Sequence, residues 1–389
     1  MNGAELGALR PAASFPALWI DRRTELMAHS PARGTISRGG DMPDGDEDSR
    51  TRLLTLDGLR GLGALLVLLY HCGFLLKAPL ATHGHIAVDF FFLLSGFIMA
   101  RTYQARLAAG QARAFLRARV VRLWPLMAIG CAFALLADVA IHQTSSPLKL
   151  AIKFVLGLLC LPVISGAPYL NGPQWSLMFE GFANLCHAFS LKRLYRPLLT
   201  AIVLISAAGL VIGVANHLDV NGAYGGTEQY VPVLRLFFSY TMGLLIYTLP
   251  LPSIRLPFWA PAGVMMAFAL FPKLPSASVM DLAAVLVAWP LLLIGSIHDP
   301  GRSPATASAL KLLGALSYPL YILHFPILML VKHFGAGQPP AVLIPIAVAL
   351  SLAAAWAGML ADPPARRLFA AALAVIRPPT PLASRAAPS

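Results

Sequence analysis

The sequence predicts an all-α protein, a polytopic bundle of transmembrane helices. Of its 389 residues, 57% are hydrophobic and 12% are charged, whereas soluble domains average about 25% charged residues. Apolar runs of about 18 to 20 residues recur along the chain, and this length crosses the hydrocarbon core of a bilayer. The net charge is +13, and many arginines cluster between the apolar runs. That pattern favours a lipid bilayer with a positive cytoplasmic side over a nucleic-acid partner.

Two polar ends flank the apolar region. Residues 1–50 are rich in Gly, Pro, Ala, Arg and Asp and contain no long apolar run, so we expect a disordered cytoplasmic segment. Residues 51–370 form the predicted membrane domain, and residues 371–389 form a Pro- and Ala-rich tail. No signal peptide is visible, and either Met27 or Met42 could be the true start.

The membrane domain contains eleven apolar segments. They cover residues 58–76, 87–105, 120–140, 150–164, 175–191, 197–215, 232–249, 257–271, 280–297, 311–333 and 341–361. The fourth segment is short and is interrupted by Pro162 and Gly166. We therefore expect it to be a re-entrant or partial segment, with the other ten crossing the bilayer.

The charges of the loops support this count. The loop after the second segment is rich in arginine, which places it in the cytoplasm together with the N-terminus. If the fourth segment does not cross, Lys192, Arg193 and Arg196 also lie inside, and residues 216–230, which lack Lys and Arg, lie outside. The prediction is an integral protein of the cell (inner) membrane with both termini in the cytoplasm.

Two ionisable residues share one face of the first segment. Arg60 and His71 are eleven residues apart, which on a helix is about three turns and ~16 Å. Arg60 then lies near an interface and His71 deep in the bilayer, where an ionisable side chain usually faces a cavity or a partner. The alternative is a neutral histidine that makes one hydrogen bond inside the bundle.

The second segment offers weaker candidates. Asp89 is either a functional or an interfacial carboxylate, and Ser95 with Gly96 is either functional or a close-packing site. His85 and Asp89 have a His-x-x-x-Asp spacing that is found in some soluble acyltransferases, but the glycine that usually follows is missing. His83 and His85 lack a third ligand, so no metal site is predicted.

Further candidates lie in the third and fifth segments. Arg119 and Arg122 point the same way at the cytoplasmic interface, where they could hold a phosphorylated cofactor or anchor lipid headgroups. Glu180, Asn184 and His187 share a helical face. Glu180 could orient a histidine within the membrane, or it could be solvated near the start of its helix.

In the tenth segment, Tyr318, Tyr321 and His324 recur at spacings of three. This stripe either lines a cavity or belongs to an aromatic belt at the interface. The four cysteines lie in apolar segments without paired spacing, so no disulfide is predicted.

Taken together, five motifs resemble the acyltransferase-3 family of integral-membrane O-acyltransferases. They are LDGLRGLGALLVLLYHCG, VDFFFLLSGF, RARVVRLWP, QWSLMFEG and LSYPLYILHFPI, in this order, and they cover about residues 54–361. The resemblance implies a ten-helix domain that moves an acyl group, often acetyl, from acyl-CoA to a hydroxyl. The acceptor would be a glycan, a lipid-linked saccharide or another extracytoplasmic molecule.

The resemblance also implies roles for individual residues. Arg60 and His71 correspond to the family residues linked to activity, Glu180 to a usual site residue, and Arg119 and Arg122 to those that handle the CoA donor. His71 would act as a general base or carry the acyl group itself. Glu180 would hold the His71 ring in the tautomer that this role requires.

Four more residues complete the predicted site. Asp89, Ser95, Tyr318 and His324 are expected to bind substrate or to support the site. No SGNH-type hydrolase domain follows the membrane domain, so we expect the reaction to finish within it or with a partner. The competing classes are a proton-coupled transporter or flippase and a non-catalytic scaffold. The sequence predicts no oligomeric state.

Overall fold

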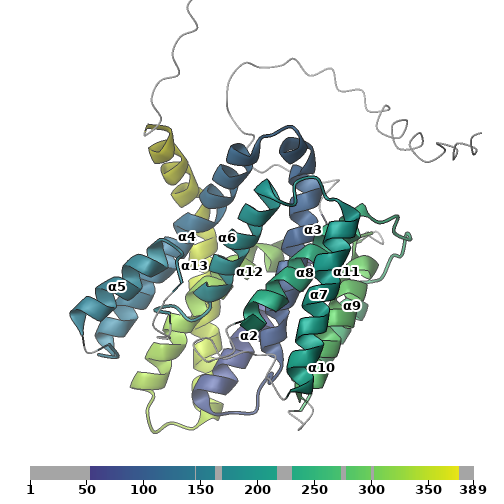
Figure 1. Cartoon of the computed structure of the whole chain (residues 1–389). Coiled ribbons are helices and arrows are strands. Elements are labelled where there is room, and N and C mark those ends of the chain that lie inside the picture. The colour runs from purple at the N-terminus through teal and green to yellow at the C-terminus, as the bar shows by residue number, and fades with distance from the viewer. Residues whose placement is uncertain are drawn as a thin grey trace, which may run out of the picture. The chain divides into compact units, whose positions relative to one another are not determined.

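The computed structural model describes residues 53–144, 146–162, 169–216, 230–272, 277–298 and 302–375. Within these ranges the chain is helical and contains no β-strand, which confirms the all-α prediction (Figure 1). The predicted disordered segment, residues 1–50, lies outside the described residues. The last helix continues to Val375, past the boundary at residue 371 where the sequence predicted a tail.

The first half of the membrane domain is built from six α-helices and one 3₁₀ turn. They are α2 (Leu54–Leu76), η1 (Gly84–Ile86), α3 (Ala87–Ala108), α4 (Ala112–Ala140), α5 (Pro147–Leu158), α6 (Gln174–Phe189) and α7 (Arg196–Ala215).

In the second half, a π-helical turn joins two helices into one continuous rod. The elements are α8 (Tyr230–Thr248), α9 (Trp259–Leu270), α10 (Ala277–Ala283), the π turn η2 (Ala284–Ala288), α11 (Trp289–Ser296), α12 (Pro304–Phe334) and α13 (Pro340–Val375).

Local sequence explains several helix ends. Ser146 and Ser303 cap α5 and α12 by accepting hydrogen bonds from backbone N–H groups, and each is followed by a proline at the first helical position. After α2, Lys77 adopts a left-handed conformation with φ of 56° and ends the helix. The chain then turns through residues 78–83 before η1 and α3.

Eight of the described helical rods are long and apolar enough to cross a membrane, counting α10–η2–α11 as one. Two helices that the sequence predicted as crossings, α6 with 16 residues and α9 with 12, are shorter. Contacts at both ends fix α9 in the bundle. Phe258, just before α9, lies against Gly58 near the start of α2, and Ala269 accepts a hydrogen bond from the backbone of His83, in the connection between α2 and α3.

The region from α5 to α6 makes one crossing in two pieces. The end of α5 lies against the middle of α4, where Trp124 donates a hydrogen bond to Leu158 O and Gly157 approaches Cys131. Helix α6 begins at the same level, since Gln174 contacts Gly157, and then continues antiparallel to α4. The fourth apolar segment therefore penetrates only part of the way.

The two closest helix pairs run parallel. In α2 and α12, Gly61 lies against Leu313, and His71 lies against His324 farther along both helices. In α3 and α8, Cβ atoms added at Gly96 and Gly243 would lie 2.1 Å from Tyr240 O and Leu93 O, so glycine allows the backbones to touch. The parallel direction of α3 and α8 requires an odd number of crossings between them, which α4, α5–α6 and α7 provide.

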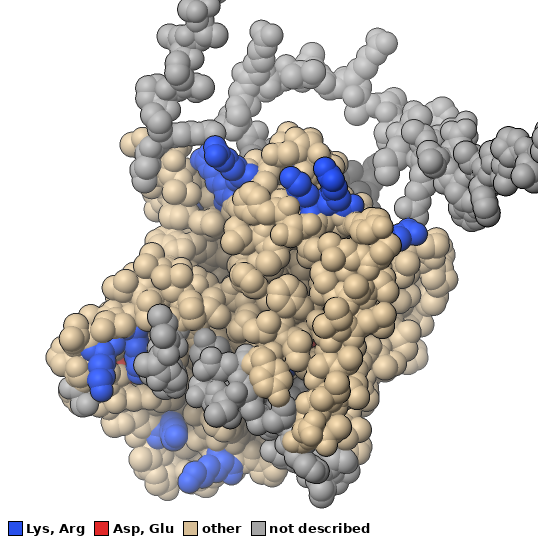
Figure 2. All heavy atoms as spheres, viewed as in Figure 1, with Lys and Arg blue, Asp and Glu red and all other residues tan. Residues whose placement is uncertain are grey.

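The surface has the distribution of charge expected of a membrane protein. Figure 2 shows Lys and Arg towards the two ends of the helices, with a band free of them between on this face. Large apolar side chains are exposed on the helices, among them Leu204 and Ile205 of α7, which are 62% and 69% exposed. Such a belt is stable in hydrocarbon and not in water.

Candidate active site

Two histidines from different helices meet at the centre of the predicted site. His71 of α2 lies with its Nδ1 atom 3.1 Å from Nε2 of His324 in α12. His324 is fully buried, and its own Nδ1 atom lies 2.9 Å from the carbonyl oxygen of Leu320, one turn earlier in the same helix. The parallel packing of α2 and α12 is what brings these two residues together.

This chain of contacts defines the tautomer of both neutral rings. A carbonyl oxygen only accepts hydrogen bonds, so Nδ1 of His324 carries its proton and Nε2 carries a lone pair. That lone pair accepts from His71, whose proton therefore lies on Nδ1. Nε2 of His71 is then left with a lone pair and can act as a base or a nucleophile.

Arg60 is fixed on α12 at the other end of the same face. Its Nε donates to Ser317 Oγ and a terminal nitrogen donates to Gly314 O, both at 2.9 Å, while Asp57 lies 3.3 Å away. Ser317 also donates to Gly314 O at 2.7 Å. Arg60 therefore links the start of α2 to the middle of α12, three turns from His71.

Glu180 belongs to a different group of contacts from the histidines. Its Oε1 atom accepts from Arg119 at 2.5 Å and from Ser95 at 2.9 Å, so it links α6 to α4 and α3. Among the residues that the structure describes, the side chain that contacts the His71 ring through a hydrogen bond is His324. The group that orients His71 is thus a histidine, and the expected contact with Glu180 is not formed.

Arg122 differs from its neighbour Arg119 although both belong to α4. Arg119 is buried and paired, whereas Arg122 is exposed and forms no hydrogen bond or ion pair with the part of the chain that is described. Arg122 interacts electrostatically with Arg60, Arg119, Arg366 and Asp362. We call Arg60, Arg119, Arg122 and Arg366 the arginine cluster. Arg366 was not among the residues that the sequence predicted for the site.

Asp89 and Tyr318 serve as links between helices. Both oxygens of Asp89 accept from Arg235 of α8, and these two side chains are 0% and 1% exposed. Tyr318 donates to Leu123 O at 2.6 Å and ties α12 to α4.

The polar face of α6 divides between two neighbours. While Glu180 turns to Arg119, Asn184 and His187 contact the Tyr240 hydroxyl of α8 at 3.2 and 3.1 Å. Sequence reasoning missed Arg235 and Tyr240. The signal for Arg235 was a lone cation within an apolar segment, which requires a buried counter-charge such as Asp89.

The comparisons with known proteins agree with this architecture. The family model Acyl_transf_3, described as an acyltransferase domain, matches residues 53–360. The chain is 33% identical over 187 residues to "Protein 2 in picA locus" of Rhizobium radiobacter, covering 42% of this chain and 96% of that protein. It is 26% identical over 302 residues to "Putative membrane-bound transacylase BcsY" of Komagataeibacter xylinus, covering 71% and 73% of the two chains. No solved structure matches the chain.

The helical bundle and the family match define the class of protein: an acyltransferase embedded in a membrane. The chain belongs to the acyltransferase-3 family, as its five motifs suggested.

Proposed function

We propose that this protein transfers an acyl group, with acetyl as the first choice, from acyl-CoA to a hydroxyl group of an extracytoplasmic glycan or lipid-linked saccharide. The observation that carries the proposal is the contact between His71 and His324, which leaves Nε2 of His71 unprotonated. The proposal places the protein in the inner membrane with both termini in the cytoplasm. This orientation puts the arginine cluster on the side where acyl-CoA is available.

The donor is proposed to bind at the arginine cluster. CoA carries several phosphate charges, and guanidinium groups bind phosphate oxygens through paired hydrogen bonds. Arg122 is the member best suited to a ligand, because it is exposed and forms no hydrogen bond or ion pair with the described residues. Arg60 lies in the same cluster, so a donor bound there lies at one end of the helical face that leads to His71.

His71 supplies the chemistry between donor and acceptor. The acceptor oxygen attacks the thioester carbonyl while Nε2 of His71 takes the hydroxyl proton. The carbon–oxygen bond forms, the carbon–sulfur bond breaks, and the proton passes from His71 to the departing thiolate to give free CoA. In the covalent variant, Nε2 attacks the thioester first, and the carbon–sulfur bond breaks to release the CoA thiolate. The acceptor oxygen then takes the acyl group as the carbon–nitrogen bond breaks, and the hydroxyl proton passes to the thiolate. The hydrogen bond to His324 stabilises the positive imidazole in either route.

The test has two readouts. The first is the release of CoA thiol from acetyl-CoA by membranes that contain the protein. The second is mass analysis of acyl groups on cell-surface glycans and secreted products. We expect His71→Ala to lower both readouts at least about a hundredfold, the usual contribution of a positioned base. His324→Phe should lower the rate less, because the base remains but its tautomer is no longer held. Normal insertion and thermal stability of both variants are the controls.

Other outcomes contradict the proposal in distinct ways. Coupled solute flux without thiol release would favour a transporter. Thiol release that persists in His71→Ala would remove His71 from the reaction while leaving acyl transfer in place.

A further inference from the structure

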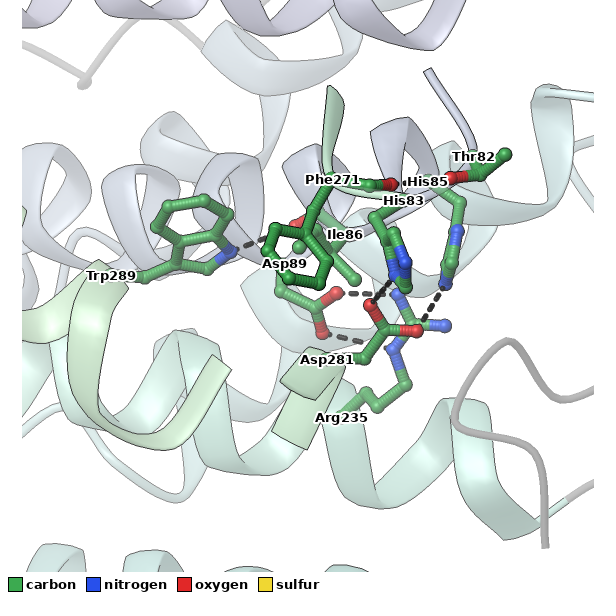
Figure 3. Close-up of polar contacts among 9 residues, drawn as sticks. All are labelled: Thr82, His83, His85, Ile86, Asp89, Arg235, Phe271, Asp281 and Trp289. Atoms are coloured by element: carbon green, nitrogen blue, oxygen red, sulfur yellow. Dashed lines mark hydrogen bonds and ion pairs between the residues drawn. The ribbon is translucent and has the colours of Figure 1, made fainter. Parts of the chain in front are cut away.

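A second group of histidines lies close to His71 in the connection between α2 and α3. His83 Nδ1 is 2.5 Å from Oδ1 of Asp281 in α10, and His85 Nε2 is 3.2 Å from Oδ2 of the same carboxylate (Figure 3). Asp281 is 2% exposed and His83 is 2% exposed. One buried carboxylate is thus flanked by two imidazoles. We call these three residues the His–Asp–His group.

The connection that carries the two histidines is held firmly. Thr82 donates to Phe271 O at 2.8 Å, and Trp289 donates to Ile86 O at 2.9 Å, as Figure 3 shows. A Cβ atom at Gly84 would lie 2.4 Å from Leu66 O of α2, so the connection lies directly on that helix. Thr82 and Trp289 therefore anchor this connection through contacts that lie outside the His–Asp–His group.

The group has unused hydrogen-bonding capacity. Nε2 of His83 and Nδ1 of His85 are buried and have no hydrogen-bond partner among the described residues. A buried polar atom without a partner costs free energy of folding, so such atoms usually have a ligand or water. Two such nitrogens beside one carboxylate exceed what a purely structural clamp requires.

His85 also lies beside the proposed reaction centre. The ring of Tyr70 packs against His85 with centroids 5.2 Å apart and against His71 at the same distance. His71 and His85 are close enough to interact electrostatically. The connection folds back onto the turn of α2 between Leu66 and Tyr70, so the group lies beside the turn that leads to His71.

We propose that the His–Asp–His group binds the acceptor, with His85 holding the hydroxyl that receives the acyl group; this rests on the proposed function. Imidazole nitrogens both accept from and donate to hydroxyl groups, and neighbouring hydroxyls of a sugar would satisfy His83 and His85 together. The Asp281 carboxylate disfavours an anionic acceptor. Phe74, 68% exposed, stacks on Tyr70 and adds an apolar face beside the histidines.

The experiment separates acceptor binding from donor binding and from loop stability. Full-length His85→Gln and Asp281→Asn proteins are compared with the wild type for acyl groups on cell-surface glycans and secreted products, measured by mass. CoA affinity and thermal stability are measured on the purified proteins. Thr82→Val is the matched control, because it removes an anchor of the same connection and leaves the His–Asp–His group intact.

We expect His85→Gln to lower acylation per inserted protein at least about tenfold, the effect of losing one hydrogen bond to a reacting group. Its CoA affinity should stay within about twofold of the wild-type value, and its thermal stability should be no lower than that of Thr82→Val. Unchanged acylation in His85→Gln would overturn the proposed acceptor site. A loss of acylation that is matched by an equal loss of CoA affinity or of thermal stability would also overturn it. If the wild-type protein itself acylates nothing, the proposed function fails, and the acceptor site falls with it.

Discussion

Arg119 and Arg122 lie three residues apart on one helix, yet their surroundings give them different tasks. Arg119 is buried and neutralises Glu180, whereas Arg122 is exposed near three other arginines. We expect Arg122→Gln to weaken CoA binding about tenfold, because a charge-assisted hydrogen bond to phosphate is lost. Arg119→Gln should instead reduce thermal stability, since it leaves the Glu180 carboxylate without its counter-charge.

Calorimetry of CoA binding to purified protein, at low and high salt, measures this difference. Arg117→Gln is the matched control, because Arg117 is an exposed arginine on the same helix outside the cluster. An Arg122→Gln protein that binds CoA as well as Arg117→Gln would contradict the donor assignment.

For individual residues, the sequence predicts candidate site residues more successfully than it predicts the contacts between them. A charge in an apolar run is conspicuous, and the shared face of Arg60 and His71 follows from helical periodicity. The partner of His71 is 253 residues away in the chain, and that of Asp89 is 146 residues away. Such pairings depend on which helices pack together, which periodicity does not specify. The expectation that Glu180 orients His71 was wrong for this reason.

Glycines decide how closely the helices approach. Helices α3 and α8 touch through Gly96 and Gly243, where an added Cβ would lie 2.1 Å from a carbonyl oxygen of the facing helix. Gly243→Ala should therefore separate the two helices and destabilise the protein by about 1–3 kcal/mol, the usual cost of overpacking. It would also disturb the nearby pair of Asp89 and Arg235, which joins the same helices.

Thermal unfolding in detergent measures this effect, with Gly181→Ala as the control. Gly181 also lies within a helix, but an added Cβ there would meet no atom within 4 Å. Alanine favours helix by about 1 kcal/mol over glycine, so Gly181→Ala should be neutral or stabilising. Equal melting temperatures for the two variants would show that the α3–α8 contact tolerates extra volume.

Hydropathy predicted nearly all of the helices because each long apolar run must satisfy its backbone internally within lipid. It could not predict that α5 and α6 share one crossing. Trp124, Gly157 and Gln174 make that arrangement possible through contacts that no periodic pattern reveals. The short α9 was likewise predicted from its apolar composition, but its contact with His83 depends on packing that composition does not specify.

For the whole molecule, the parallel pairs α2–α12 and α3–α8 constrain how the chain passes through the membrane. With ten crossings and a cytoplasmic N-terminus, residue 113 at the start of α4 lies inside and residue 338 between α12 and α13 lies outside. Arg113 and Gln338 are both exposed, so cysteines introduced there should be accessible to a reagent. Gln338→Cys should react with a membrane-impermeant thiol reagent in intact cells, and Arg113→Cys only after the membrane is opened.

The unmodified chain is the control for this labelling, because its four cysteines are buried or partly buried. Labelling of both positions in intact cells, or the reverse order, would contradict the orientation. An inverted molecule would place the arginine cluster outside, away from cytoplasmic acyl-CoA. The direction of transfer from a cytoplasmic donor to an outer acceptor therefore depends on this measurement, since the chemistry at His71 is the same in either orientation.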